Sequence, residues 1–143
     1  MSPDNQQAEN RPDDPADLLP EQSILSLSEY LSMNAAIGDR TQFEIVYRLI
    51  YTDTEHVTMD VLVEMIGEPY DETTDHVSSL IDDGLVQRRE QAIHGSTRTL
   101  TYYRATSLGE TVLNEGVLTL IDREHEFEEA YSSSDPSSDG DLP

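Results

Sequence analysis

Residues 58–84 place two short segments with the apolar spacing of helices on either side of a turn. The first segment is expected to begin after Thr58 and to end at the turn Gly67-Glu68-Pro69. The second is expected to begin at about Asp71 and to end at Gly84. Their inward-facing apolar residues are Val61, Leu62, Met65 and Ile66 in the first and Val77, Leu80 and Ile81 in the second. Two helices joined by a short turn that contains glycine predict a helix-turn-helix.

Two more helices are expected before this pair. Ser26 followed by Glu29 has the spacing of a capping box, and Asp39 followed by Gln42 has the spacing of a second helix start. On the first helix, one face is formed by Leu27, Leu31 and Ala35. On the second, helical spacing relates the residues expected at the centre of the core, which are Phe43, Val46, Tyr47, Leu49 and Ile50.

A hairpin and a last helix are expected after the pair. Residues 85–90 and 99–104 are rich in Val, Thr, Tyr and Arg and flank the turn His94-Gly95-Ser96, which predicts two strands. Ser107 followed by Glu110 has the spacing of another capping box. The apolar residues of the helix that follows are Val112, Leu113, Val117, Leu118, Leu120, Ile121 and Phe127, with Gly116 among them where a kink is expected.

Both ends of the chain have the composition of acidic, disordered tails. Residues 1–22 hold six acids and one Arg, and residues 132–143 have the sequence SSSDPSSDGDLP. Residues 23–106 are expected to form a single winged helix-turn-helix domain, mainly α with a small β-hairpin wing, and residues 107–131 are expected to form a C-terminal helix. A chain of 143 residues leaves no room for a separate catalytic domain.

The charge is strongly negative. Thirty Asp and Glu stand against eight basic residues, all of them Arg, for a formal net charge of -22. Acidic chains without Lys are typical of a salt-rich cytoplasm, because molar salt shortens the Debye length to roughly 3 Å and screens self-repulsion. We therefore expect a halophilic host. An acidic disordered protein is the alternative, which the patterned apolar residues of the middle region disfavour.

Several classes of site are not expected. The absence of cysteine excludes disulfides, thiol catalysis and thiolate metal sites. No secretory signal and no apolar run of membrane-spanning length is recognisable, so a cytoplasmic location is expected. No phosphate-binding glycine loop or activated nucleophile is recognisable, so we expect neither an enzyme nor a cofactor. Asp122, His125 and Glu128 could share a helix face as a zinc site, but a solvated acidic face is favoured and no metal is expected.

The order of these elements and three short sequences resemble the ArsR-like winged-helix regulators of haloarchaea over residues 24–131. The sequences are AIGDRT at 36–41, HVSSL at 76–80 with GLV at 84–86, and YYRAT at 102–106. The resemblance implies a homodimeric transcriptional regulator that inserts the second helix of its helix-turn-helix into the major groove of double-stranded DNA. The groove positions that it implies are Tyr70, Glu72, Thr74, Asp75, His76 and Ser79. The dimer contacts expected from the first and last helices are Leu27, Leu31, Val117, Leu118, Leu120, Ile121 and Phe127.

Arginine is concentrated in the expected wing. Half of the chain's basic residues lie within residues 87–104, namely Arg88, Arg89, Arg98 and Arg104. Since affinity for duplex DNA comes largely from neutralised phosphates, we predict that at least two of the first three contact phosphate and that Arg104 is structural. His94 and Ser96 at the tip are expected to reach a minor groove. Alternatively, the arginines protect an edge strand and pair with acids of a neighbouring helix.

The expected groove-binding helix is acidic. It contains Asp71, Glu72, Asp75, Asp82 and Asp83 and no basic residue. Carboxylates can accept from cytosine amino groups, but salt or bound cations must offset their repulsion from phosphates. Some could instead face solvent, and Asp71 could be the N-cap. A winged-helix module that binds proteins in transcription, with little or no DNA binding, explains this acidity better and the arginine wing less well.

Tyr102 and Tyr103 could in principle stack on bases. Because adjacent strand residues point to opposite faces, both cannot line one stacking platform. Core packing is therefore the expected role of one of them.

Overall fold

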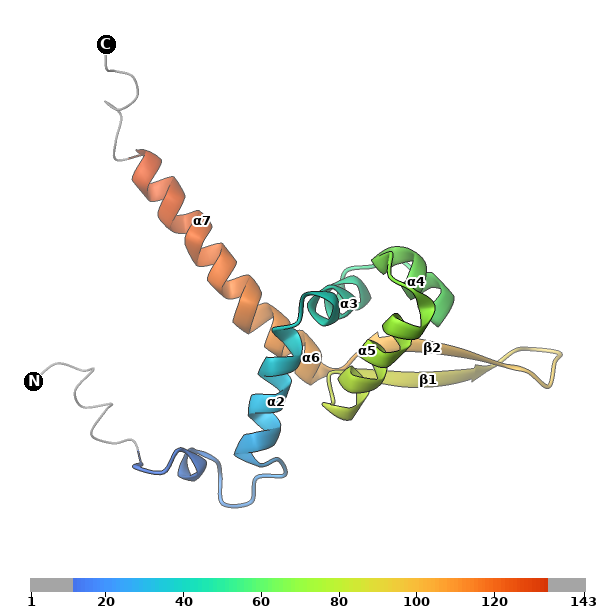
Figure 1. Ribbon diagram of the computed structural model, residues 1–143, viewed down its shortest axis with the longest axis horizontal. Helices are drawn as coiled ribbons and strands as arrows, with labels where there is room; N and C mark the ends of the chain where they lie inside the picture. Colours follow the sequence, from blue (N-terminus) through green and yellow to red (C-terminus); the bar gives the residue numbers. More distant parts are fainter. Residues whose placement is uncertain (1–11, 134–143) are drawn as a thin grey trace, which may run out of the picture.

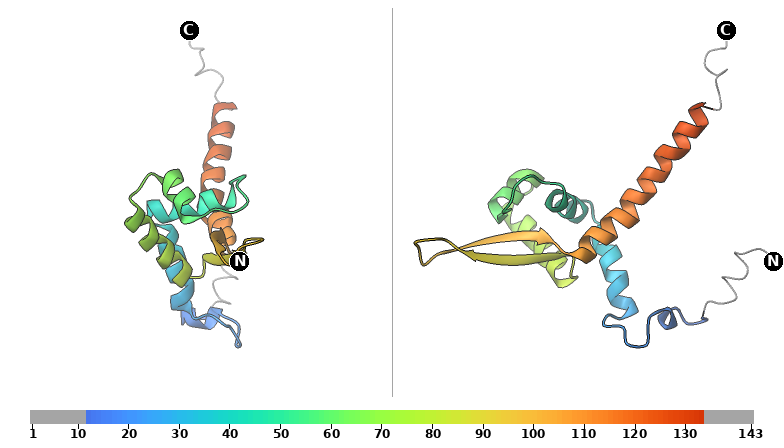
Figure 2. Two further views of the ribbon diagram at one scale, coloured as in Figure 1. Left: turned by 90° about the vertical axis from the view of Figure 1, so that its right-hand side faces the viewer. Right: turned by 180° about the vertical axis from the view of Figure 1, so that it is seen from behind.

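The computed structural model describes residues 12–133 of the chain, with side chains through residue 130. Most of this part is helical, a two-stranded hairpin extends from one side, and a long C-terminal helix extends from the other (Figures 1 and 2). Residues 1–11 and 134–143, which belong to the two predicted tails, lie outside the described residues. Pro15–Leu18 (η1), within the predicted N-terminal tail, form one turn of 3-10 helix.

The capping signals begin helices α2 and α3. Helix α2, Leu27–Ile37, follows Ser26, whose hydroxyl accepts a hydrogen bond from the Glu29 N–H at 3.1 Å, while the Glu29 carboxylate accepts from the Ser26 N–H at 2.8 Å. Helix α3, Arg40–Ile50, follows Asp39, whose carboxylate accepts from the N–H of residue 42 at 3.0 Å. Both predicted starts are confirmed. In each, a side chain satisfies an N–H that has no partner within the helix.

Helices α4, Met59–Ile66, and α5, Tyr70–Asp82, form the predicted helix-turn-helix. Thr58 caps α4, as predicted. Helix α5 begins one residue earlier than predicted, after Pro69, and no side chain caps it. Asp71 therefore lies within its first turn, and the alternative that it is the N-cap is wrong.

Two glycines terminate these helices as predicted. Gly67 and Gly84 each have φ of 79°. Residues with a Cβ rarely adopt this left-handed conformation, which turns the chain away at a helix end.

The wing is an antiparallel hairpin of β1, Val86–Ala92, and β2, Thr99–Ala105, in which Arg88 lies opposite Tyr103. The predicted hairpin is confirmed, and β1 continues two residues further toward the tip than predicted. The Tyr103 N–H also donates to the Val57 carbonyl at 2.9 Å. This isolated bridge fixes the α3–α4 connection to the base of the wing.

The last helical region is interrupted by one π-helical segment. Helix α6, Ser107–Val112, continues through the π-helical segment η2, Leu113–Val117, into helix α7, Leu118–Ser133. Gly116, where a kink was expected, lies inside η2. A π turn is a recognised cause of irregularity in an otherwise α-helical segment.

The cap of α6 differs from the prediction by one residue. Thr106 accepts from the Gly109 N–H at 3.0 Å, so the predicted capping box of Ser107 and Glu110 is wrong. The Thr106 hydroxyl also donates to the Gly84 carbonyl at 2.6 Å. This second bond ties the start of α6 to the end of α5 and selects Thr106 as the cap.

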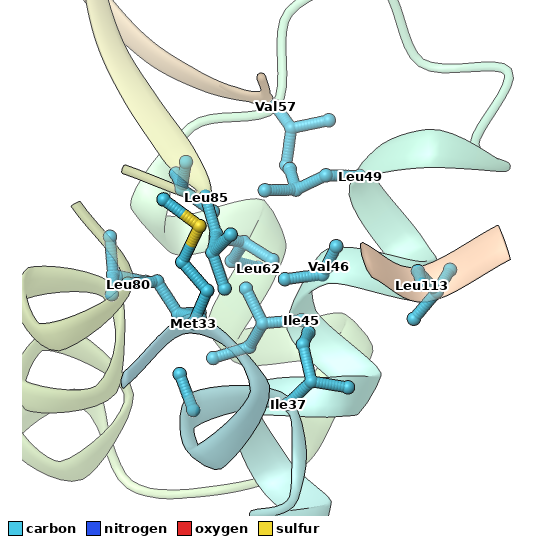
Figure 3. Packing of buried hydrophobic residues seen from close by; sticks show 13 residues of the cluster. Met33, Ile37, Ile45, Val46, Leu49, Val57, Leu62, Leu80, Leu85 and Leu113 are labelled. Atoms are coloured by element: carbon cyan, nitrogen blue, oxygen red, sulfur yellow. The ribbon is translucent and has the colours of Figure 1, made fainter. Parts of the chain in front are cut away.

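The core is formed by residues of α2, α3, α4, α5 and η2, together with the α3–α4 connection and the base of the wing (Figure 3). Its buried apolar residues are Met33, Ala36, Ile37, Ile45, Val46, Leu49, Val57, Leu62, Val77, Leu80, Leu85, Val86 and Leu113. Removal of these side chains from water is the main favourable contribution to folding. No helix among the described residues is both long and apolar enough to span a bilayer.

The apolar face noted in the sequence for α2, which includes Leu31, is not the face that packs on the core. The helix buries Met33, Ala36 and Ile37, whereas Leu31 is 58% exposed and Ala35 is also exposed. The cause is the position of α2 in the fold, because its C-terminal turn packs on the core while its first two turns extend beyond it (Figure 1).

Helix α3 lies in the core as predicted, with Val46 and Leu49 buried. Ile45, which the sequence pattern did not single out, has no exposed surface, and Tyr47 is 39% exposed. Tyr47 lies between Phe43 and Tyr51 in a row of aromatic rings, with centroids 6.1 and 5.0 Å from its own. A helix with neighbours on several sides buries a broader face than one apolar stripe.

Candidate nucleic-acid interface

Helix α5 has a buried face and a polar face. Thr73, Val77 and Leu80 are buried. Of the predicted groove residues, those with exposed side chains are Tyr70, Glu72, Asp75 and Ser79, and those half-buried are Thr74 and His76. The predicted groove residues therefore lie along one helix, and their side chains differ in how exposed they are.

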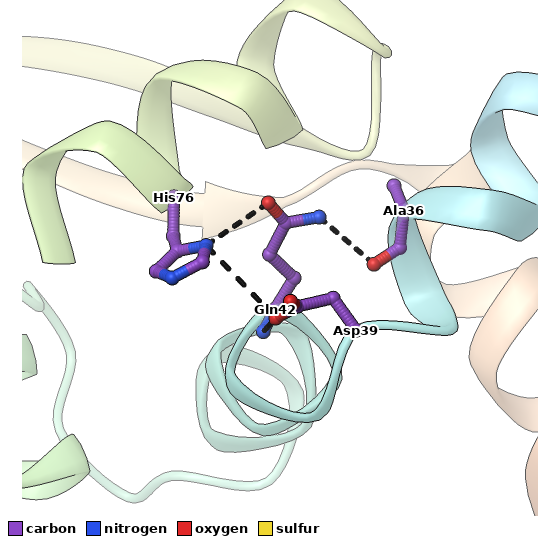
Figure 4. Close-up of polar contacts among 4 residues, drawn as sticks. All are labelled: Ala36, Asp39, Gln42 and His76. Carbon is purple, nitrogen blue, oxygen red and sulfur yellow. Dashed lines mark hydrogen bonds and ion pairs between the residues drawn. The ribbon is translucent and has the colours of Figure 1, made fainter. Parts of the chain in front are cut away.

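His76 takes part in a polar cluster that joins α5 to α3 (Figure 4). Its Nδ1 lies 3.1 Å from Gln42 Oε1 and 3.9 Å from a carboxylate oxygen of Asp39. Gln42 in turn donates from Nε2 to the Ala36 carbonyl at 2.8 Å. His76 is therefore not a freely exposed side chain, because its Nδ1 faces Gln42 and Asp39. Contact between His76 and DNA would have to use Nε2.

The exposed face of α5 is acidic. Asp71, Glu72, Asp75 and Asp82 are exposed, and no basic residue lies within the helix. Asp83, which follows the helix, accepts from the Ser32 hydroxyl at 2.7 Å. This face carries carboxylates that can accept hydrogen bonds from base amino groups and that repel phosphates.

The wing has the opposite charge. All four of its arginines have exposed side chains, and within the described part of the chain none of them lies within 4.0 Å of a carboxylate. The carboxylate of Glu90, the acid of this segment, accepts from the Thr99 hydroxyl at 3.3 Å. The alternative that the arginines pair with acids of a neighbouring helix is therefore not observed. Arg104, which was expected to be structural, likewise forms no ion pair with the described residues. The guanidinium groups are therefore available to an external anion.

The strand register separates these arginines. Arg88 lies opposite Tyr103, and Arg89 lies opposite Tyr102, so the two arginines project from opposite faces of the hairpin. Arg104 lies opposite Gln87, which is two positions before Arg89 on the same strand, so Arg89 and Arg104 share one face of the hairpin. The alternation of a strand, readable in the sequence, was the signal that could have shown this arrangement.

The tip of the wing is a turn around Gly95, which has φ of 77°. The Ser96 N–H donates to the Ile93 carbonyl at 3.1 Å, and the Arg98 N–H donates to the Ser96 hydroxyl at 3.0 Å. His94 and Arg98 are exposed on either side of this turn. The tip therefore holds a histidine and an arginine at the outermost point of the domain (Figure 1).

The two tyrosines of β2 have different environments, as their alternation predicts. Tyr103 packs against the core. Tyr102 lies on the other face, where its ring meets the His56 ring edge to face at a centroid distance of 4.5 Å. The expected core role of one tyrosine is confirmed for Tyr103.

The residues predicted for dimerisation fall into two groups. Val117 and Leu118 pack against the core of the chain itself, and Leu27 is half-buried. The others are exposed, with exposed fractions of 58% for Leu31, 71% for Leu120, 41% for Ile121 and 66% for Phe127. Exposed apolar side chains are thus found on both α2 and α7.

Two contributors to this region were not found from the sequence. Gln42 was singled out only as a helix start, yet its side chain is buried and connects α2, α3 and α5. His56 was not singled out in the sequence, but the bridge between Val57 and Tyr103 brings it to the wing. Neither position has a local signal. No group of three or more potential metal ligands is found in the part of the chain that the structure describes.

A helix-turn-helix followed by a β-hairpin and a closing helix defines the winged helix-turn-helix fold. Solved structures with this fold are similar to the chain at low sequence identity. One, from Enterococcus faecalis V583, is described as a transcriptional regulator of the MarR family; it has a TM-score of 0.57, 15% identity, and coverage of 80% of this chain and 99% of that one. Another is the homodimeric winged helix-turn-helix DNA-binding domain of a Mycobacterium bovis protein described as a candidate ArsR-family regulator, with a TM-score of 0.54, 18% identity, and coverage of 84% and 94%. No family model and no curated protein matches the chain.

Proposed function

We propose that the chain is a sequence-specific regulator of transcription that binds double-stranded DNA as a homodimer. Helix α5 lies in the major groove, and the wing contacts phosphates. The observation that carries this proposal is the wing itself, which concentrates four exposed arginines in a chain of charge -22. Within residues 12–130, none of these arginines lies within 4.0 Å of a carboxylate. In such an acidic molecule, a local excess of cationic groups favours an anionic ligand.

Base reading is assigned to the exposed face of α5. Ser79, Asp75 and Glu72 can contact base edges directly, whereas His76 contributes through Nε2 because its Nδ1 faces Gln42. Phosphate contact is assigned to Arg88, Arg89 and Arg98, and minor-groove contact to the tip residues His94 and Ser96. The two similar structures of regulators support this assignment of function by their fold.

The dimer is assigned to the exposed apolar residues of α2 and α7. Leu31, Leu120, Ile121 and Phe127 are exposed apolar side chains, and an interface with a second copy would remove them from water. The Mycobacterium bovis domain is homodimeric, which supports the same assembly here.

A second candidate function is a protein-binding module that makes little or no contact with DNA. The observation in its favour is the acidic face of α5, which has four exposed carboxylates and no basic residue. Phosphates would repel this face, whereas a basic protein surface would attract it.

Fluorescence anisotropy distinguishes the two functions. The full chain is titrated into labelled DNA from upstream of its own coding region and into a scrambled fragment of equal composition, over a range of KCl up to molar concentration. Tighter binding to the upstream fragment, with affinity that falls as salt rises, supports the regulator. A folded dimer that binds neither fragment at any salt concentration overturns it in favour of the protein-binding module.

A further inference from the structure

A cavity of about 410 Å³ lies between the α3–α4 connection and strand β2, at the base of the wing. It is partly open to solvent and large enough for a small molecule, since ligand sites usually measure roughly 300–1,000 Å³. The bridge between Val57 and Tyr103 holds its two walls together through a hydrogen bond of 2.9 Å. The cavity is therefore part of the packed fold.

Two side chains of opposite charge line this cavity and form no ion pair with each other. Arg104 from β2 and Glu55 from the α3–α4 connection both contribute to its wall. Among the described residues, neither side chain forms an ion pair within 4.0 Å or a hydrogen bond. The two charged groups therefore lie more than 4.0 Å apart in the wall of one cavity, and a molecule that carries both charges could pair with each of them.

The remaining wall is polar and aromatic. His56 and Tyr102 meet edge to face at 4.5 Å and form an aromatic surface. The Thr52 hydroxyl accepts from the Thr54 N–H at 3.0 Å, so its own proton can be donated to a ligand. A ligand here would find one cationic group, one anionic group, a hydroxyl donor and a surface for a side chain.

We propose that this cavity binds a small zwitterion of the α-amino-acid class. The Arg104 guanidinium pairs with the ligand carboxylate through two parallel hydrogen bonds, and the Glu55 carboxylate pairs with the ammonium group. The ligand side chain lies against Tyr102 and His56. A simple anion would pair with Arg104 but be repelled by Glu55. A simple amine would pair with Glu55 but be repelled by Arg104. A zwitterion can pair with both residues and is therefore favoured.

Isothermal titration calorimetry of the full chain in molar KCl, without DNA, tests this proposal. Each of the common free L-amino acids is the probe, together with the amine and the carboxylic acid that match the best binder, and inorganic phosphate. At least one amino acid is expected to give saturable heat, and each single-charge analogue and phosphate to bind at least about tenfold more weakly, which corresponds to about 1.4 kcal/mol.

The variants Arg104→Gln and Glu55→Gln are each expected to raise the Kd about tenfold. The matched controls are Arg98→Gln on the same hairpin and Asp53→Asn beside Glu55, neither of which lines the cavity. Because Arg104 and Glu55 are exposed, these variants should retain the parental Tm. The proposal is overturned if no amino acid binds, if a single-charge analogue or phosphate binds as tightly, or if Arg104→Gln behaves like Arg98→Gln.

Discussion

Gln42 Oε1 lies 3.1 Å from His76 Nδ1, and this contact connects the start of α3 to the middle of α5. Gln42 also donates to the Ala36 carbonyl, so one side chain links three helices of the domain. A buried amide outside the exposed face of α5 thus helps to hold this helix in place.

We expect Gln42→Ala to lower the free energy of unfolding by about 1–3 kcal/mol, because the Ala36 carbonyl and His76 lose a partner in a site that water reaches poorly. Urea denaturation followed by circular dichroism measures the change. Gln91→Ala, at an exposed position of β1, is the matched control and should be neutral. Equal effects of both variants would show that the cluster contributes no stability.

Loss of both Arg88 and Arg89 should weaken binding to the upstream and scrambled DNA alike. Each phosphate contact that is lost should reduce the slope of log K against log salt by about 0.9. Because the two side chains project from opposite faces, Arg88→Ala and Arg89→Ala alone should have unequal effects. Anisotropy titrations across a KCl series provide the slopes. Unchanged slopes in the double variant would remove the wing from the interface.

Ser79→Ala should change sequence preference without changing Tm, since the side chain is exposed. A lost base contact costs about 1–3 kcal/mol at one base pair. Binding to a library of single-base variants of the preferred site measures the preference. Ser78→Ala is the control, because Ser78 is also exposed but is not among the predicted groove residues. Identical preferences in all three proteins would contradict base reading by Ser79.

Gly109→Ala should destabilise the protein by about 1–3 kcal/mol, because overpacking forces the backbone to move. A Cβ at this position would overlap the carbonyl group of Leu85. Gly116→Ala, where a Cβ meets nothing within 4 Å, should be neutral or stabilise by up to about 1 kcal/mol through helix propensity. Thermal unfolding of the two variants compares them directly, and a Tm for Gly109→Ala at or above the parental value would be inconsistent with this close approach.

Leu120→Glu should raise the dimer Kd at least about tenfold, because it places a charge in the proposed apolar interface. Sedimentation equilibrium in molar KCl measures the assembly. Leu18→Glu, which changes another exposed leucine outside the proposed interface, should leave the dimer intact. If Leu120→Glu remains as dimeric as the parent, α7 is not the dimer surface.

The sequence alone determined where most elements begin and end. Ser26, Asp39 and Thr58 cap helices, and Gly67 and Gly84 end them, as predicted. These signals are reliable because a cap or a left-handed glycine acts within one turn of the chain. The concentration of arginine in the wing was equally readable, and strand alternation would have placed Arg88 and Arg89 on opposite faces.

Only the tertiary structure decided which faces are buried and which distant residues meet. Thr106 replaced Ser107 as a cap because the Gly84 carbonyl lies beside it. Gln42 met His76, and Glu55 came to line one cavity with Arg104, because helix packing and the bridge between residues 57 and 103 bring separate segments together. Such contacts depend on the relative positions of whole elements, which local spacing does not encode.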